Sequence, residues 1–244
     1  MNFNGLKDER GPTTPLFAGK TKELVKRCQK LSVKEIAGIM KINTRMAHDV
    51  YEKYQMYGSR NTPKRAAALA YNGIAYNGLN AHDFSQEEYD FAQQQLNILS
   101  ALYGLLRPFD AIKPYRLDMQ THITPQGYGS LYHFWQESVN VALTKRLRKE
   151  KEKTIINVAS DEYAKVVQKK RLPAGTKIID IRFLQQENSD LKQIVVHTKK
   201  ARGLISRFII KNRLTEAEDV MGFDDEGYFF YPALSKESEW VFVR

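Results

Sequence analysis

Residues 199–213, KKARGLISRFIIKNR, are the stretch that decides the predicted fold. Apolar residues recur at positions 201, 204, 205, 208 and 209, which is the spacing of one face of an amphipathic α-helix. Six lysines and arginines lie in the same stretch, and no acid does. A solvated helix face normally mixes both signs of charge, so we favour anion binding over simple solvation for this face.

Strand-like segments lie on both sides of this helix. Five runs rich in β-branched or aromatic residues predict strands: 154–159, 177–184, 193–198, 227–231 and 240–243. Asn188-Ser189-Asp190 predicts the tip of a hairpin that joins the second and third of them. The sequence contains no repeat, low-complexity stretch or flexible linker. We therefore predict an α+β fold, a central β-sheet wrapped by helices, in one domain over residues 1–244.

The first half of the chain is predicted to be mostly helical. Residues 1–20 hold three glycines and two prolines and are interpreted as a loop. Residues 21–57 have helical spacing with breaks near Ser32 and Asn43. Ser85 and Glu88 have the spacing of a capping box that starts a further helix, and residues 130–149 predict another with a basic end.

Composition excludes several classes of protein. The 244 residues are 42% hydrophobic and 27% charged, which is ordinary for a soluble globular chain and excludes disorder. The apolar runs are too short to span a membrane, and no secretory signal opens the sequence. A single cysteine, Cys28, excludes an internal disulfide and a multi-cysteine metal site. These features predict a cytoplasmic protein that has no membrane partner.

Positive charge is unevenly distributed along the chain. The formal net charge is +10, and residues 141–213 carry 19 basic and 7 acidic residues, whereas residues 214–244 carry 2 and 8. Basic surface on folded structure attracts phosphate backbones. Nucleic-acid contact is one interpretation, and a solvated surface that only keeps the chain soluble is the other.

A second cluster surrounds Gly104. A helix, a glycine turn and a short helix beginning near Pro108 would make a helix–hairpin–helix-like element over 99–112, whose backbone N–H groups can bind phosphate. Arg107, Lys113 and Arg116 would add positive charge. The alternative is an ordinary turn between two helices, ended by a proline, that has no binding role.

A third polar cluster is Ser160, Asp161, Glu162 and Tyr163, directly after a predicted strand. Ser160 or Asp161 is placed to cap a helix, and the alternative is a cleft in which two carboxylates act as acid and base. The sequence contains no Walker loop, dinucleotide fingerprint or nucleophile elbow, and its five histidines are scattered. No catalytic residue, metal site or cofactor is therefore predicted.

Several blocks together resemble the bacterial YaaA family. They span most of the chain in the same order: 91–108, 113–119, 157–163, 199–209, 222–223 and 227–230. The resemblance implies a cytosolic protein of the peroxide-stress response that limits unincorporated iron and so lowers Fenton damage. It also implies DNA binding through a positively charged cleft and a helix–hairpin–helix-like element, and it implies no established enzymatic activity.

The resemblance places DNA contacts on the glycine of the predicted hairpin and on the basic residues of the two clusters, with selectivity for DNA structure rather than sequence. These residues are Gly104, Arg107, Lys113, Arg116, Lys199, Lys200, Arg202, Arg207 and Lys211. An enzyme acting on nucleic acid or another phosphate-bearing substrate at residues 160–163 is the alternative, and direct iron binding is a third possibility. Family members usually begin with an apolar strand and Ser-Pro-Ala-Lys-Thr, which this sequence lacks before Met1-Asn2-Phe3. We therefore expect that strand and its lysine to be missing.

Overall fold

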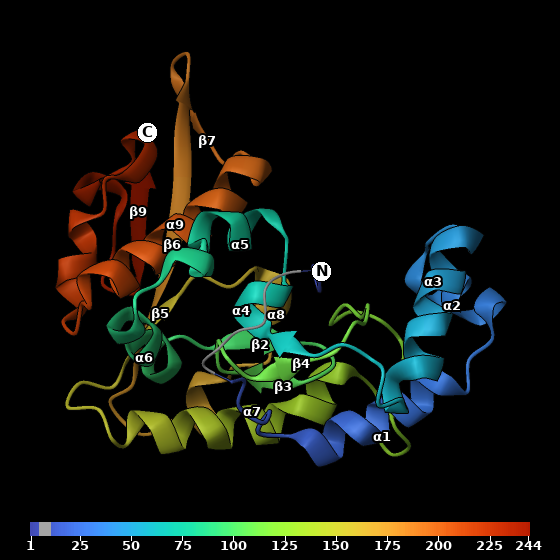
Figure 1. Cartoon of the computed structure of the whole chain (residues 1–244). Helices are drawn as coiled ribbons and strands as arrows, with labels where there is room; N and C mark the ends of the chain where they lie inside the picture. The colour runs from blue at the N-terminus through green and yellow to red at the C-terminus, as the bar shows by residue number, and fades with distance from the viewer. Residues whose placement is uncertain (5–10) are drawn as a thin grey trace. The chain divides into compact units, whose positions relative to one another are not determined.

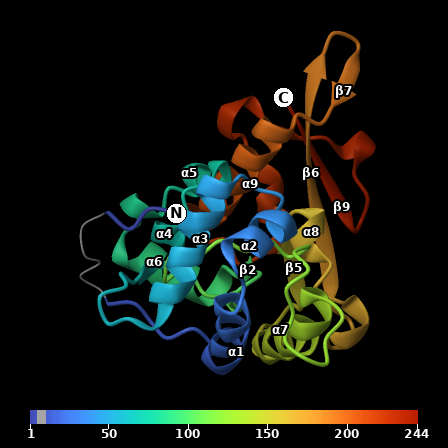
Figure 2. The ribbon, with the colours of Figure 1, turned by 90° about the vertical axis from the view of Figure 1, so that its right-hand side faces the viewer.

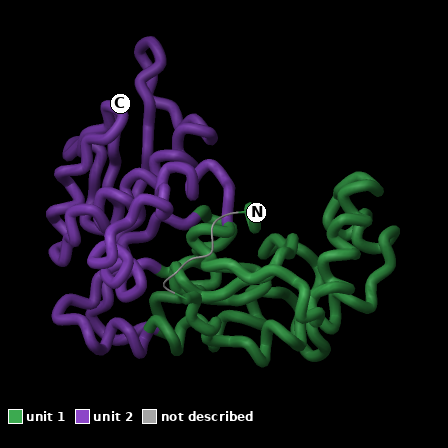
Figure 3. Tube along the Cα trace, in the orientation of Figure 1, with its two compact units in different colours: residues 1–70, 97–143, 160–171 green, residues 71–96, 144–159, 172–244 purple. Residues whose placement is uncertain are grey.

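The computed structural model describes residues 1–4 and 11–244 (Figures 1 and 2). The chain forms two compact units, each assembled from three separate segments (Figure 3). Unit 1 comprises residues 1–70, 97–143 and 160–171, and unit 2 comprises residues 71–96, 144–159 and 172–244. The α+β class is confirmed, whereas the single domain over 1–244 stays a prediction. Among the described helices, none combines the length and apolar character needed to cross a membrane.

Three helices follow the predicted N-terminal loop in unit 1: α1 Ala18–Gln29, α2 Val33–Met40 and α3 Thr44–Gln55 (Figure 2). Residues 5–10 of that predicted loop lie outside the described residues. Ser32 and Glu35 form a capping box at the start of α2. The Asn43 side chain accepts a 2.9 Å hydrogen bond from the Met46 N–H and caps α3. The predicted breaks near Ser32 and Asn43 are confirmed.

Four short strands and several further helices complete the described part of unit 1. In chain order the elements are η1 Met56–Gly58, β1 Arg65–Ala66, α4 Ala67–Ala70, β2 Ile98–Ser100, β3 Gly104–Leu106, β4 Ala111–Ile112, α7 Leu131–Leu147, α8 Asp161–Ala164 and η3 Lys169–Arg171. Strands β1 and β4 pair antiparallel, and so do β2 and β3. The predicted helix over 130–149 is α7, and its last four residues belong to unit 2.

The helix–hairpin–helix prediction for residues 99–112 is wrong, because β2 and β3 form a β-hairpin there. Leu105 and Leu106 are fully buried, and a short run buried on both faces has the same periodicity in a strand as in a helix. Gly104 has φ +74°, and a Cβ there would lie 2.5 Å from Cε3 of Trp135. The glycine therefore turns the strand beside a buried indole ring. The predicted short helix after Pro108 is also absent, since residues 107–110 form a turn.

Unit 2 contains a mixed sheet covered on one face by α9. Its elements are α5 Ile74–Leu79, η2 Ala81–Asp83, α6 Gln86–Gln95, β5 Thr154–Asn157, β6 Lys177–Glu187, β7 Asp190–Lys192, α9 Val195–Asn212, η4 Ala217–Gly222, η5 Asp225–Gly227, β8 Phe229–Phe230, η6 Pro232–Leu234 and β9 Glu239–Val243. The strand order is β5-β6-β9-β8, with β8 antiparallel to β9 and the other two pairs parallel. Phe183, Phe242 and Ile205 form part of the core between sheet and helix.

The hairpin tip at Asn188 is confirmed, but the strand predicted over 193–198 is wrong. β7 pairs with β6 only as far as Lys192, opposite Gln185. Val195 and Val196 then open α9 and are 61% and 56% exposed, so no sheet partner covers their β-branched side chains. The preference of β-branched residues for strands reflects how well they pack on the surface of a sheet, and Val195 and Val196 have no sheet to pack against.

Helices α5 and α9 cross at two glycines. A Cβ at Gly203 would lie 1.8 Å from the Ala75 carbonyl oxygen, and one at Gly78 would lie 2.5 Å from that of Lys200. No side chain fits at either position, so the two backbones are in direct contact. The unusual glycine inside the basic helix is therefore explained by another backbone and not by a ligand.

We predict that Gly203→Ala lowers the free energy of unfolding by about 2 kcal/mol or more, because overpacking against backbone atoms cannot relax. Gly38→Ala is the matched control, since Gly38 lies inside α2 with no atom within 4 Å of the added Cβ. The control gains about 1 kcal/mol from helix propensity. Urea denaturation of both variants measures the difference. Equal stability of the two variants would contradict the close helix crossing.

Candidate nucleic-acid interface

The basic face of α9 is neutralised by acids from an earlier part of the chain. The Arg207 guanidinium makes two 2.7 Å hydrogen bonds to the Asp83 carboxylate. Lys211 Nζ lies 2.8 Å from Glu88 and 3.4 Å from Asp83. Both cations also lie over the ring of Phe84. Arg207 and Lys211 therefore already have carboxylate partners, which the absence of acids within residues 199–213 does not reveal.

These ion pairs shift the protonation of their members. The hydrogen bond from Arg207 holds the pKa of Asp83 below its usual value, and the same contact raises the pKa of Arg207. Partial burial of Glu88 acts against its ionisation, but the Lys211 hydrogen bond and the Ser85 backbone bond outweigh it and lower its pKa. Both carboxylates favour the charged form in the folded chain.

We predict that Asp83→Asn destabilises the chain in a pH-dependent way. A folded-state pKa below the unfolded value gives stability that is complete above the unfolded pKa of about 4 and is lost as pH falls through the folded pKa. The melting temperature should therefore drop at neutral pH, and the drop should vanish in acid. Asp83 is 47% exposed, so the loss is about 1 kcal/mol or less. Asp90→Asn on α6 is the control, and a pH-independent difference would contradict the ion pair.

The other predicted residues of α9 differ in their exposure. Lys200 forms an ion pair with Glu226. Arg202 is half-buried, whereas Lys199 is exposed and forms no ion pair with a described residue. Of the five cations predicted on this helix, Lys199 is the one whose charge is available without breaking an existing contact.

Two of the three cations predicted around Gly104 are held by other residues of unit 1. Arg107 bonds the fully buried Asp110 through Nη2 at 2.7 Å and Nε at 3.1 Å. Lys113 Nζ donates to the carbonyl oxygen of Tyr57, and burial lowers the pKa of this lysine. Arg116 remains exposed. Arg107 and Lys113 thus brace the fold, and Gly104 is buried beside Trp135.

The Ser160–Tyr163 cluster is also part of the unit 1 scaffold. Ser160 occupies the N-cap of α8, but its side chain makes no capping bond. The Glu162 carboxylate accepts the backbone N–H groups of Met119 at 2.9 Å and Gln120 at 3.4 Å. A carboxylate held in this way braces a loop, which does not favour a role as general acid or base. Asp161 is exposed.

Cations without an ion pair to a described residue also lie on a segment outside the two basic clusters that were predicted from the sequence. Unit 1 contains 21 basic and 11 acidic residues, whereas unit 2 contains 17 of each. We call residues 18–64, which hold α1, α2, α3 and the loop after them, the N-terminal basic segment. Nine of its cations are exposed and form no ion pair with another described residue: Lys22, Lys26, Arg27, Lys30, Lys34, Lys41, Arg45, Arg60 and Lys64.

Helices α2 and α3 of this segment form a helix–turn–helix pair. An 8-residue helix and a 12-residue helix are joined by residues 41–43, and Lys41 takes the left-handed conformation with φ 51°. Ile36 and Val50 bury the inner faces. Pairs of this kind can place the N-terminal turn of the second helix against DNA. The predicted breaks near Ser32 and Asn43 coincide with the N-caps of these two helices.

Comparison with known proteins agrees with the earlier resemblance. The sequence model of the family described as peroxide stress protein YaaA matches residues 1–234. The chain belongs to the YaaA peroxide stress protein family. A UPF0246 protein of Acaryochloris marina (strain MBIC 11017) is 39% identical over 234 residues, which cover 95% of this chain and 91% of that relative. Among the described residues, no three or more His, Cys, Asp or Glu side chains are grouped so that they could hold a metal ion.

Proposed function

We propose that this YaaA family member is a cytoplasmic, DNA-binding protein of the peroxide-stress response, and that DNA contacts its N-terminal basic segment. The observation that carries the proposal is the exposure of nine cations there that form no ion pair with a described residue. Arg207 and Lys211 already bind carboxylates, so phosphate would have to displace an existing ion pair. Phosphate reaches the N-terminal cations without that cost.

The helix–turn–helix pair gives this contact a geometry. The first turn of α3 exposes Arg45, and the connecting turn exposes Lys41. Backbone N–H groups at a helix start favour anions, and cations beside them add to the attraction. Such contacts position DNA without reading its bases. The proposal is therefore binding that depends on DNA structure more than on sequence.

We predict that replacing Lys34, Lys41 and Arg45 together by glutamine weakens DNA binding at least tenfold. The slope of log affinity against log salt should flatten by up to about 3, because each lost phosphate contact removes about one released ion. Fluorescence anisotropy with duplex, bubble and junction DNA at several salt concentrations measures both quantities.

The matched control replaces Lys145, Lys199 and Lys236, which are exposed cations of unit 2, by glutamine. It removes the same charge, so it should keep most of the affinity and the slope. Equal weakening by the two triple variants would place the interface elsewhere. A folded wild-type chain that binds none of the three DNA forms at low salt would refute DNA binding.

We further propose that this binding helps to limit unincorporated iron and Fenton damage after peroxide stress, which membership of the YaaA family supports. In cells that lack the chain, the wild type should lower chelatable iron measured by electron paramagnetic resonance after peroxide exposure. The triple variant at Lys34, Lys41 and Arg45 should fail to do so, and the unit 2 control should succeed. Full activity of the segment variant would separate iron limitation from DNA contact.

A further inference from the structure

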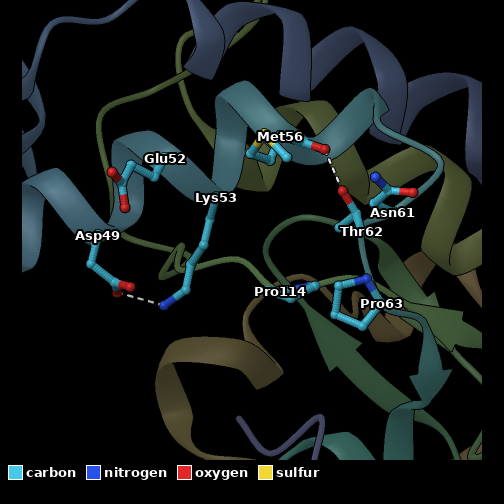
Figure 4. A pocket seen from close by; sticks show the side chains of 8 residues that line it. All are labelled: Asp49, Glu52, Lys53, Met56, Asn61, Thr62, Pro63 and Pro114. Atoms are coloured by element: carbon cyan, nitrogen blue, oxygen red, sulfur yellow. Dashed lines mark hydrogen bonds and ion pairs between the residues drawn. The ribbon is translucent and has the colours of Figure 1, made fainter.

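A pocket in unit 1 lies at the end of α3, on the N-terminal basic segment (Figure 4). It is open to solvent and has a volume of about 230 Å³. The side chains that line it come from α3, from the loop that follows and from a proline farther along the chain: Asp49, Glu52, Lys53, Met56, Asn61, Thr62, Pro63 and Pro114. Drug-sized ligands occupy roughly 300–1,000 Å³, so this pocket is suited to a smaller group.

The pocket combines apolar walls with hydrogen-bonding groups. Met56, Pro63 and Pro114 offer the flat or polarisable contacts that an aromatic ring prefers. Asn61 has a side-chain amide that makes no hydrogen bond with another described residue. The Glu52 carboxylate is 65% exposed, and it lies 3.5 Å from Nδ1 of His48. Both groups are therefore able to bind a ligand.

The remaining polar groups of the pocket are already engaged. Lys53 Nζ forms an ion pair with Asp49, and this pair neutralises one of the two carboxylates (Figure 4). The Thr62 hydroxyl donates to the Met56 carbonyl oxygen. The hydrogen-bonding groups that stay available are Glu52 and Asn61, which lie on opposite sides of the pocket (Figure 4).

Positive charge borders the same loop. Arg60 and Lys64 lie directly before and after the lining residues 61–63, and both are exposed without an ion pair to a described residue. Arg45 precedes Lys53 by eight residues on α3, which is about 12 Å along the helix axis. A phosphate backbone that contacts Arg45 and continues along α3 for about 12 Å would reach the pocket.

We propose that the pocket takes one unpaired base of the bound DNA and prefers a base with an exocyclic amino group. The inference rests on the proposed DNA binding and names what the site recognises. A base inside a duplex is stacked, so only an unpaired or extruded base can enter a concave site. Carboxylate and amide oxygens accept hydrogen bonds from amino groups such as cytosine N4. Phosphates on either side of that base would contact Arg60 and Lys64.

The test uses labelled duplexes that carry one bulged nucleotide, either cytosine or uracil, beside the fully paired duplex. These two bases have rings of the same size, and cytosine carries an amino group where uracil carries a carbonyl oxygen. We expect the wild type to bind the cytosine bulge about 5-fold to 10-fold more tightly than the uracil bulge, as one discriminating base contact allows. The double variant Glu52→Gln and Asn61→Leu should bind the two bulges equally.

Glu23→Gln on α1 is the matched control, because it removes an exposed carboxylate of the same segment that does not line the pocket. It should keep the preference for cytosine. The paired duplex separates the two proposals. Normal duplex binding by the wild type with equal affinity for both bulges overturns the base pocket alone, whereas no binding to any duplex overturns the proposed function.

A competition experiment distinguishes binding of a base within DNA from binding of a free nucleotide. Deoxycytidine monophosphate at micromolar concentration should not displace the bulged duplex, because it lacks the neighbouring phosphates. Displacement at that concentration would overturn the assignment of the pocket to DNA. A tightening of all duplexes by the double variant, with the cytosine preference intact, would show only a general charge effect and would also overturn it.

Discussion

Arg207 and Asp83 lie 124 residues apart in the sequence, and two hydrogen bonds of 2.7 Å join them in unit 2. With Lys211 and Glu88 they fasten α9 to the segment that holds η2 and α6. The glycine crossing of α5 and α9 brings the same parts of the chain together. Because these contacts pair Arg207 and Lys211 with carboxylates, the most basic helix of the sequence does not offer the largest number of unpaired cations. With Arg207 and Lys211 paired, the N-terminal basic segment still offers nine exposed cations that form no ion pair with a described residue.

Local signals of the sequence predicted many of the elements. The apolar spacing of 199–213, the break near Ser32, the capping box at Ser85 and the hairpin tip at Asn188 all correspond to structure. Residues 98–106 were mispredicted because their apolar side chains are buried in strands, where a short run carries no distinctive period. The start of α9 was misplaced because Val195 and Val196 have strand propensity without a sheet partner.

The candidate site was harder to predict than the fold, since charge counting along the sequence cannot show which ions pair. Arg107 and Asp110 are close in sequence, yet only the structure shows that Asp110 is fully buried and that Arg107 is its partner. The carboxylates that neutralise α9 come from residues 83–88, far outside any local window. The predicted breaks near Ser32 and Asn43 mark where the two helices of the helix–turn–helix pair begin, but nothing local distinguishes a pair that binds DNA from one that only packs.

The central claim is that free charge on the N-terminal basic segment, and not the paired charge of α9, contacts DNA. Hydrogen–deuterium exchange with and without duplex DNA tests it most directly, because it reports on both parts of one chain in one experiment. The account predicts slower exchange over residues 18–64 and unchanged exchange over 195–212 when DNA is bound. Protection confined to 195–212 would contradict it.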